Sequence, residues 1–93
     1  MCEWPFDEPE NVATLTVRQV THGGQPILIV ARDAVAGMWQ FHTGGPFDMA
    51  DALIVALQEV FHIDPSIGEL ADLPPGWKAQ RSAPGQPWRR QPA

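Results

Sequence analysis

The stretch VATLTVRQV, residues 12–20, decides the fold of this chain, because β-branched residues dominate it and its apolar and polar side chains alternate. Such alternation is typical of a half-buried β-strand. The side chains expected to face a core are Ala13, Leu15 and Val17, and those expected to face solvent are Thr14, Thr16 and Arg18. The stretch therefore predicts a sheet with one buried face.

Two further strands are expected after it. Residues 27–30 are apolar on both faces, which predicts a strand in the middle of the sheet. Residues 38–43 (MWQFHT) alternate again and would place Trp39 and Phe41 in the core. Because short glycine-containing turns separate the three strands, the chain predicts an antiparallel meander.

Residues 48–63 fit two different structures. Apolar residues recur at helical spacing along the segment, and Asp48 could cap one long helix. The run Leu53–Val55, however, is apolar on every side and rich in β-branched residues, which favours a short buried strand. Periodicity alone favours the helix and leaves the strand as the alternative.

The pair Asp64 and Pro65 marks the start of a helix, because Asp is a good N-cap and Pro fits the first helical position. This helix must end by Leu73, since prolines follow and the residue before a proline disfavours helical backbone. A final short strand is expected over residues 77–81, with Trp77 facing inward.

Together these segments predict an α+β fold, with a small antiparallel sheet of about four to five strands packed with one or two short helices. The 93 residues suit a single domain, which we place at residues 1–81. Residues 82–93 are rich in proline and basic residues, so we expect an extended C-terminal tail there. At the other end, Trp4 and Phe6 are expected to anchor the acidic N-terminal arm to the body.

Cys2 is the only cysteine, so no internal disulfide can form and a reducing compartment is expected. The N-terminal residues show neither the basic nor the apolar region of a signal peptide. No apolar run approaches the ~20 residues of a membrane-spanning helix. We therefore expect a cytoplasmic protein that does not bind membranes.

Charge is divided unevenly along the chain. Residues 1–75 hold all eleven acidic residues and two arginines, a net charge of −9, whereas residues 76–93 hold a lysine, three arginines and no acid, a net charge of +4. The acidic body would repel phosphate backbones, which argues against a nucleic-acid partner. The basic end could bind an acidic partner, or it could fold back on the acidic body.

No group of residues shows the pattern of a catalytic or metal site. His22, His42 and His62 lie far apart in the sequence, whereas zinc ligands usually come in closely spaced pairs. Asp48 and Asp51 are expected to be solvated or capping carboxylates rather than an acid–base pair. Because the polar residues are dispersed, we expect no enzymatic activity, no cofactor and no metal.

The aromatic and basic residues of the C-terminal part form the best candidate binding surface. Exposed Trp and Arg side chains together are typical of binding hot spots. The candidate partner-binding residues are Trp88, Arg89, Arg90 and Trp77. In the alternative interpretation, Trp88 folds back over apolar surface of the sheet and the two arginines meet the acidic N-terminus.

Four stretches carry a resemblance to known proteins: CEWPFDEPENVA (residues 2–13), WQFHTGG (39–45), IDPSIGELADLPPGWKAQR (63–81) and PWRR (87–90). The chain resembles a family of small bacterial proteins of unknown function related to the immunity protein 33-like superfamily of polymorphic-toxin systems. Gln80 stands where that family carries a second tryptophan. The resemblance implies a strand around Leu53–Ala56, a short helix over Leu57–His62 and a helix from Asp64, and we adopt this interpretation of the ambiguous segment.

The leading hypothesis for function is a non-catalytic protein-binding domain, either a monomer or a weak homodimer. The resemblance implies one specific form, an immunity-type inhibitor of a toxin, whose association the acidic body would steer. The alternative is a small-molecule-binding or hydrolytic domain with a cleft between the sheet and its helices, which would bring His42, His62 and an aspartate around one hollow. A third hypothesis is a structural module that dimerises through an edge strand.

Overall fold

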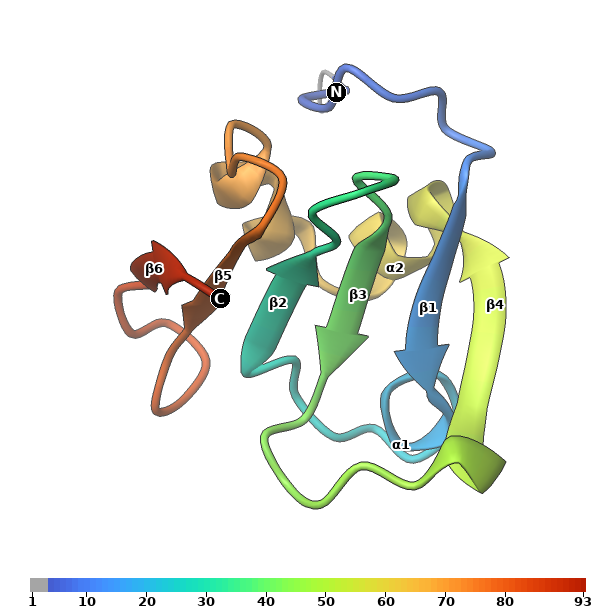
Figure 1. The fold of residues 1–93 in the computed structure, drawn as a ribbon. Coiled ribbons are helices and arrows are strands. Elements are labelled where there is room, and N and C mark those ends of the chain that lie inside the picture. The colour runs from blue at the N-terminus through green and yellow to red at the C-terminus, as the bar shows by residue number, and fades with distance from the viewer. Residues whose placement is uncertain (1–3) are drawn as a thin grey trace.

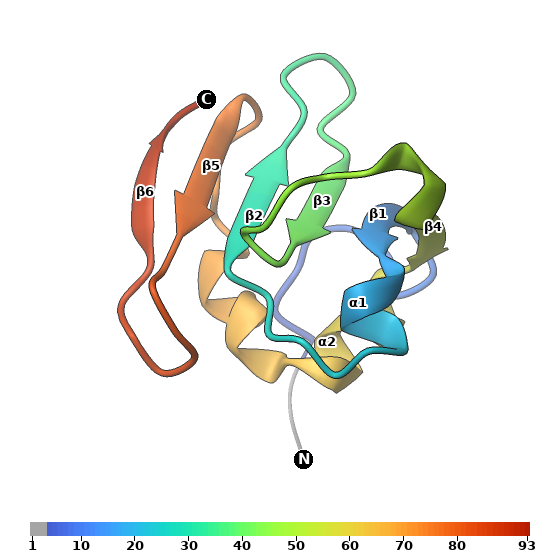
Figure 2. The same ribbon diagram turned by 90° about the horizontal axis from the view of Figure 1, so that it is seen from below.

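The computed structural model describes residues 4–93 and shows an α+β fold with one six-stranded sheet (Figure 1). The strands are β1 (Ala13–Val17), β2 (Ile29–Arg32), β3 (Trp39–His42), β4 (Ala52–Ala56), β5 (Trp77–Gln80) and β6 (Arg89–Pro92). The helices are α1 (Arg18–Thr21) and α2 (Leu57–Ile63), with the 3-10 helices η1 (Met49–Asp51) and η2 (Pro65–Leu70). Helices α2 and η2 pack on the same face of the sheet, which Figure 2 shows from below.

The sheet has the strand order β4-β1-β3-β2-β5-β6 and is mixed. β1 runs parallel to β3, whereas the other neighbouring strands are antiparallel. The predicted antiparallel sheet of four to five strands is therefore wrong in direction and in strand number. Residues 18–28 form a helical turn and a loop, and this connection leaves a gap of one strand between β1 and β2. β3 then fills that gap and pairs with both. The extra strand, β6, comes from the segment expected to be an extended tail.

The buried face of β1 is the expected one only at Val17, which lies in the core. Thr14 and Thr16 are fully buried, whereas Leu15 is only half-buried. The hydroxyl of Thr14 donates to the Val55 carbonyl and that of Thr16 to the Phe41 carbonyl, each over 3.0 Å. Because a hydrogen-bonded hydroxyl is tolerated in a core, the threonine methyl groups can pack inward.

Residues 52–63 form a strand followed directly by a helix. β4 takes up the apolar run and pairs along its length with β1, where Ile54 lies opposite Leu15. Helix α2 then begins at Leu57. The expected strand and short helix are confirmed, and the single long helix that periodicity favoured is wrong, because the β-branched run finds a strand partner in β1.

Asp64 caps the next helix as predicted. Its carboxylate accepts a hydrogen bond from the backbone N–H of Ser66 at 3.0 Å, and Pro65 occupies the first helical position. The helix is the 3-10 helix η2, which buries Ile67 and Leu70 against the sheet. The predicted strands β3 and β5 follow from the same alternation of buried and exposed residues that the sequence shows.

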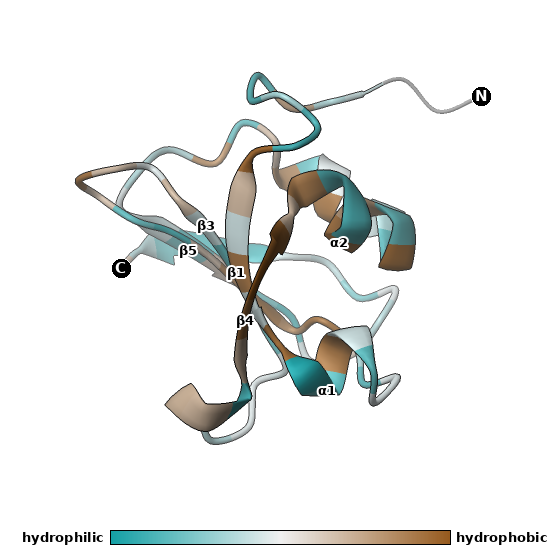
Figure 3. Cartoon of the chain, turned by 90° about the vertical axis from the view of Figure 1, so that its right-hand side faces the viewer, coloured by the Kyte–Doolittle hydropathy of each residue, from teal (hydrophilic) through white to brown (hydrophobic). Residues whose placement is uncertain are grey.

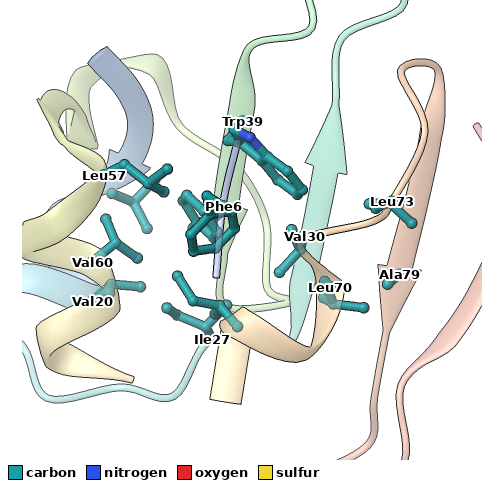
Figure 4. Packing of buried hydrophobic residues seen from close by; sticks show 13 residues of the cluster. Phe6, Val20, Ile27, Val30, Trp39, Leu57, Val60, Leu70, Leu73 and Ala79 are labelled. Atoms are coloured by element: carbon teal, nitrogen blue, oxygen red, sulfur yellow. The ribbon is translucent and has the colours of Figure 1, made fainter. Parts of the chain in front are cut away.

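One hydrophobic core fills the space between the sheet and helices α2 and η2 (Figure 4). Trp39 and Phe41 of β3 are almost fully buried in it, as predicted. Phe6 of the N-terminal arm enters the same core, where its ring centroid lies 5.4 Å from that of Trp39 in an edge-on arrangement. In Figure 4 the Phe6 ring lies between Trp39 of the sheet and Val60 of α2. The arm is therefore anchored as expected.

Polar contacts of Glu8 also hold the N-terminal arm to the sheet. Its carboxylate accepts hydrogen bonds of 2.9 Å from Arg32 Nη2 and from Trp39 Nε1. The Arg32 guanidinium lies over the Trp39 ring at 4.9 Å from the centroid, and its Nη1 donates to the Leu73 carbonyl at 2.8 Å. This cluster joins the arm to β2, β3 and the segment after η2.

We expect Phe6→Ala to lower the free energy of unfolding by about 3 kcal/mol, because it removes a buried ring and leaves a cavity in the core. The matched control is Phe47→Ala, since the Phe47 side chain is 50% exposed whereas Phe6 is 5% exposed. Urea denaturation followed by tryptophan fluorescence measures both changes. Equal losses of stability in the two variants would show that the arm is not part of the core.

Candidate functional site

The hairpin of β5 and β6 forms one edge of the sheet. Its directly opposed residue pairs are Trp77 with Pro92, Lys78 with Gln91, Ala79 with Arg90 and Gln80 with Arg89. Opposed residues share a face of the sheet, and successive residues alternate between faces. Since Ala79 is fully buried, Arg90 lies on the face covered by helices, and Lys78 and Arg89 lie on the open face.

Arg81, directly after β5, anchors this hairpin to the body. Its Nε donates to the Ile27 carbonyl at 3.1 Å, its Nη1 to Ser66 Oγ at 3.0 Å and its Nη2 to Asp64 Oδ2 at 2.7 Å. The Trp88 ring lies against the same guanidinium, 4.2 Å from its Cζ atom to the ring centroid. The Arg81 side chain is only 3% exposed, so its charge is held entirely by these neighbours.

The structure separates the four candidate binding residues. Trp88 and Trp77 are half-buried and pack against the hydrophobic core. Arg90 donates to Asp72 at 2.7 Å and to the Glu69 carbonyl at 2.8 Å, and its hydrogen bond lowers the pKa of the Asp72 carboxyl. Trp88 thus folds back as in the alternative interpretation, but Arg90 meets Asp72 after η2 rather than the N-terminus. Of the four, Arg89 remains without such a contact among the described residues.

The positive charges of the chain divide into two groups. Four of the six lysine and arginine side chains form an ion pair, namely Arg18, Arg32, Arg81 and Arg90. Lys78 and Arg89 form none with the carboxylates of residues 4–93. They are diagonal neighbours on the open face, a position in which side chains of adjacent strands lie about 7–8 Å apart. Sequence reasoning missed Lys78, although the inward Trp77 already implied that its neighbour points outward.

The open face is not covered by the main helices. Figure 3 shows α1 and α2 on one side of β1 and β4, and neither of these two helices lies on the other side. A cavity of about 560 Å³ lies at the end of the hairpin, lined by Leu28, Ile29, Thr43, Gln80, Ser82 and Arg89 among others. Arg89 therefore borders both the open face and a hollow with polar and apolar walls.

A second cavity, of about 220 Å³, brings together His42, Asp48 and Asp51. Both carboxylates are already engaged, because Asp48 accepts from the backbone N–H of Ala50 at 2.9 Å and Asp51 pairs with Arg18 at 3.1 Å. Burial lowers the pKa of His42, and its ring packs edge-on against Phe47. Among the described residues no hydrogen bond joins either carboxylate to the imidazole, whose Nε2 lies 3.3 Å from Gln40 Oε1 instead.

His42 and His62 line different cavities, so the arrangement that would indicate hydrolysis is not formed. Among residues 4–93, no three His, Cys, Asp or Glu side chains are placed to hold a metal ion. Within the same range, no helix combines the length and apolar character that crossing a membrane requires. Cys2 lies outside the described residues.

The chain matches no protein-family model, no curated protein and no solved structure. The candidate site therefore rests on the geometry of this chain alone.

We expect Asp64→Ala to lower the free energy of unfolding by about 3 kcal/mol or more, because it leaves the buried Arg81 charge unpaired. The matched control is Asp72→Ala, which removes the exposed ion pair with Arg90 and should leave the unfolding midpoint almost unchanged. Urea unfolding of both variants gives the comparison. A midpoint for Asp64→Ala close to that of Asp72→Ala would contradict the anchoring role of Arg81.

The pKa of His42 predicts the direction of a pH effect. Since burial lowers the pKa of His42 in the folded protein, the unfolded chain takes up this proton first as the pH falls below about 6.5. The free energy of unfolding should therefore decrease between about pH 7 and pH 5, and this part of the decrease should be absent in His42→Gln. Urea midpoints across that range measure the two slopes. Identical slopes in the two proteins would refute the assignment.

Proposed function

We propose that this chain is a non-catalytic protein-binding domain that holds an acidic segment of a partner on the open face of the β5–β6 hairpin. The observation that carries the proposal is the placement of Lys78 and Arg89, the two cations without an ion pair among the described residues, side by side on that face. Two neighbouring cations without a counter-ion create a local positive potential that favours an anionic ligand.

The surrounding charge limits the size of that ligand. The chain as a whole carries a net charge of −5, and residues 1–75 carry all of its acidic residues. A long polyanion such as a nucleic acid would extend beyond the hairpin and meet this acidic body. A short acidic peptide segment, in contrast, can pair with Lys78 and Arg89 without leaving the hairpin.

The shape of the surface suits an extended segment. A segment lying across β5 and β6 would meet Gln80 and Gln91, whose amides lie on the same face as the two cations. The cavity of about 560 Å³ beside Arg89 provides a place for one larger side chain of the partner. The two cations would select a ligand of negative charge, and the cavity would select the shape of one of its side chains.

The resemblance to immunity-type proteins supplies a biological form for this function. In that form the partner is a toxin, and its acidic segment binds the hairpin, in place of the attraction to the acidic body that the sequence suggested. The domain would act by stoichiometric binding, which agrees with the dispersed polar residues and the occupied carboxylates of the second cavity.

The test is a titration of the labelled protein with hexaglutamate, followed by amide chemical shifts. We expect shifts on the strands of the hairpin, weak affinity in the millimolar range, and loss of the shifts at ~0.5 M salt, because exposed ion pairs are weak and screened. Arg89→Ala should abolish the shifts. Arg90→Ala is the matched control, since it removes the same charge from the adjacent residue on the other face and should leave binding intact.

Two results would contradict the proposal. One is a set of shifts that lies away from the hairpin, and the other is an equal loss of binding in both arginine variants, which would indicate a response to net charge alone. The same two variants test the immunity form in cells that express a toxin encoded beside this gene. There, Arg90→Ala should protect as the unchanged protein does, and Arg89→Ala should not.

A further inference from the structure

The two edges of the sheet differ in chemistry. β6 carries Arg89, Arg90 and Pro92 in its four residues, and charged residues and proline are the usual protection of an exposed edge. β4, at the other edge, has the sequence ALIVA, with no charge and no proline. Ile54 at its centre is 63% exposed. An unprotected apolar edge of this kind is suited to pairing with another strand.

The backbone of β4 offers hydrogen bonds to such a strand. The N–H of Leu57 donates to the Val12 carbonyl at 2.9 Å, which places the backbone groups of Leu57 toward β1. Backbone groups alternate in direction along an antiparallel strand. The N–H and C=O groups of Ile54 therefore point away from β1, as do the carbonyl of Ala52 and the N–H of Ala56, and no other strand lies beyond β4 in the described sheet. The remaining two groups are used within the chain, since the Ala52 N–H donates to the Met49 carbonyl and the Ala56 carbonyl, at the N-cap of α2, accepts the first bond of that helix.

We propose that two copies of this chain pair through their β4 strands, antiparallel, about a twofold axis at Ile54. In this register Ile54 of one copy lies opposite Ile54 of the second, and Ala52 lies opposite Ala56. The two Ile54 residues then exchange a pair of N–H···O bonds, and the Ala56 N–H of each copy donates to the Ala52 carbonyl of the other. Every opposed pair is apolar, so the strand is complementary to itself, as a twofold interface requires.

The groove beside β4 supports the same partner. Its floor is formed by Leu53 and Val55, with Thr21 and His22 at the end of α1 on one side and Gln58, Glu59 and His62 of α2 on the other. A twofold axis at Ile54 brings the α1 end of each copy beside α2 of the other. The end of α1 carries His22 and α2 carries Glu59, so this arrangement sets a hydrogen-bond donor of one copy opposite an acceptor of the other.

The size of the contact sets its strength. The paired edge is one strand of five residues, about 17 Å long, with short helices at either end. Such a contact lies at the lower end of specific interfaces, so we infer a dimer that forms at raised protein concentration. The interface lies at the opposite edge from Lys78 and Arg89, and the dimer therefore does not depend on the proposed binding of an acidic segment.

The test is disulfide crosslinking of Ile54→Cys in a Cys2→Ser background. In a hydrogen-bonded antiparallel pair the opposed Cα atoms lie about 5.5 Å apart, a distance that a disulfide can span. We expect Ile54→Cys to form a covalent dimer at high protein concentration under mild oxidation. Ala52→Cys is the matched control on the same strand, because the two copies of residue 52 would lie about 13 Å apart in this register. Val35→Cys, at a position 95% exposed, measures random collision.

Crosslinking of Ala52→Cys or Val35→Cys as fast as Ile54→Cys would overturn the proposal, as would no crosslink at all. Light scattering on the unchanged protein gives a second measurement. We expect the mass to rise from the 10.2 kDa of one chain toward twice that value with concentration, and Ile54→Lys to remain at one chain. A monomer at every concentration would refute the dimer, and the hexaglutamate titration would still report on the hairpin by itself.

Discussion

The buried guanidinium of Arg81 is the constraint on which the C-terminal half of the structure depends. Its charge is held by Asp64, by Ser66 and by the Ile27 carbonyl, so η2, the chain before β2 and the end of β5 must meet at one point. Trp88 then packs on the same group and brings the return strand β6 back to the sheet. These contacts order the basic C-terminal segment, which has no core of its own. Without them the buried charge of Arg81 would be uncompensated.

Strands with an alternating pattern could be predicted from the sequence, and the order in which they pair could not. Trp39 and Phe41 are inward because alternation and size agree. Strand order depends on whether residues 18–28 form a tight turn or a longer crossing connection, and glycines are compatible with both. The inward position of Thr14 and Thr16 could not be predicted either, since the carbonyl groups that accept from their hydroxyls belong to strands distant in the sequence.

The candidate site could also be predicted only in part, because some of its features depend on neighbouring residues and others on residues far apart in the sequence. Composition revealed a basic C-terminal segment, but which of its cations remain available depends on the carboxylates that the fold brings near them. Asp64 and Asp72 neutralise Arg81 and Arg90, and neither pairing follows from spacing along the chain. The placement of Lys78 beside Arg89 on one face could not be predicted for a different reason. Arg89 belongs to residues 82–93, a segment that was expected to form an extended tail and no strand.

The pairing of β1 has a consequence for how the chain acquires its structure. β1 lies between β3 and β4, so Thr14 finds its strand partner Val55 only after some forty further residues have been added. During synthesis, β1 therefore leaves the ribosome long before either neighbour, with its β-branched residues unpaired. Sheets dominated by such distant pairings form slowly, and their early strands are open to wrong partners in the meantime. The interval between β1 and β4 is thus when this small protein is most exposed to misfolding.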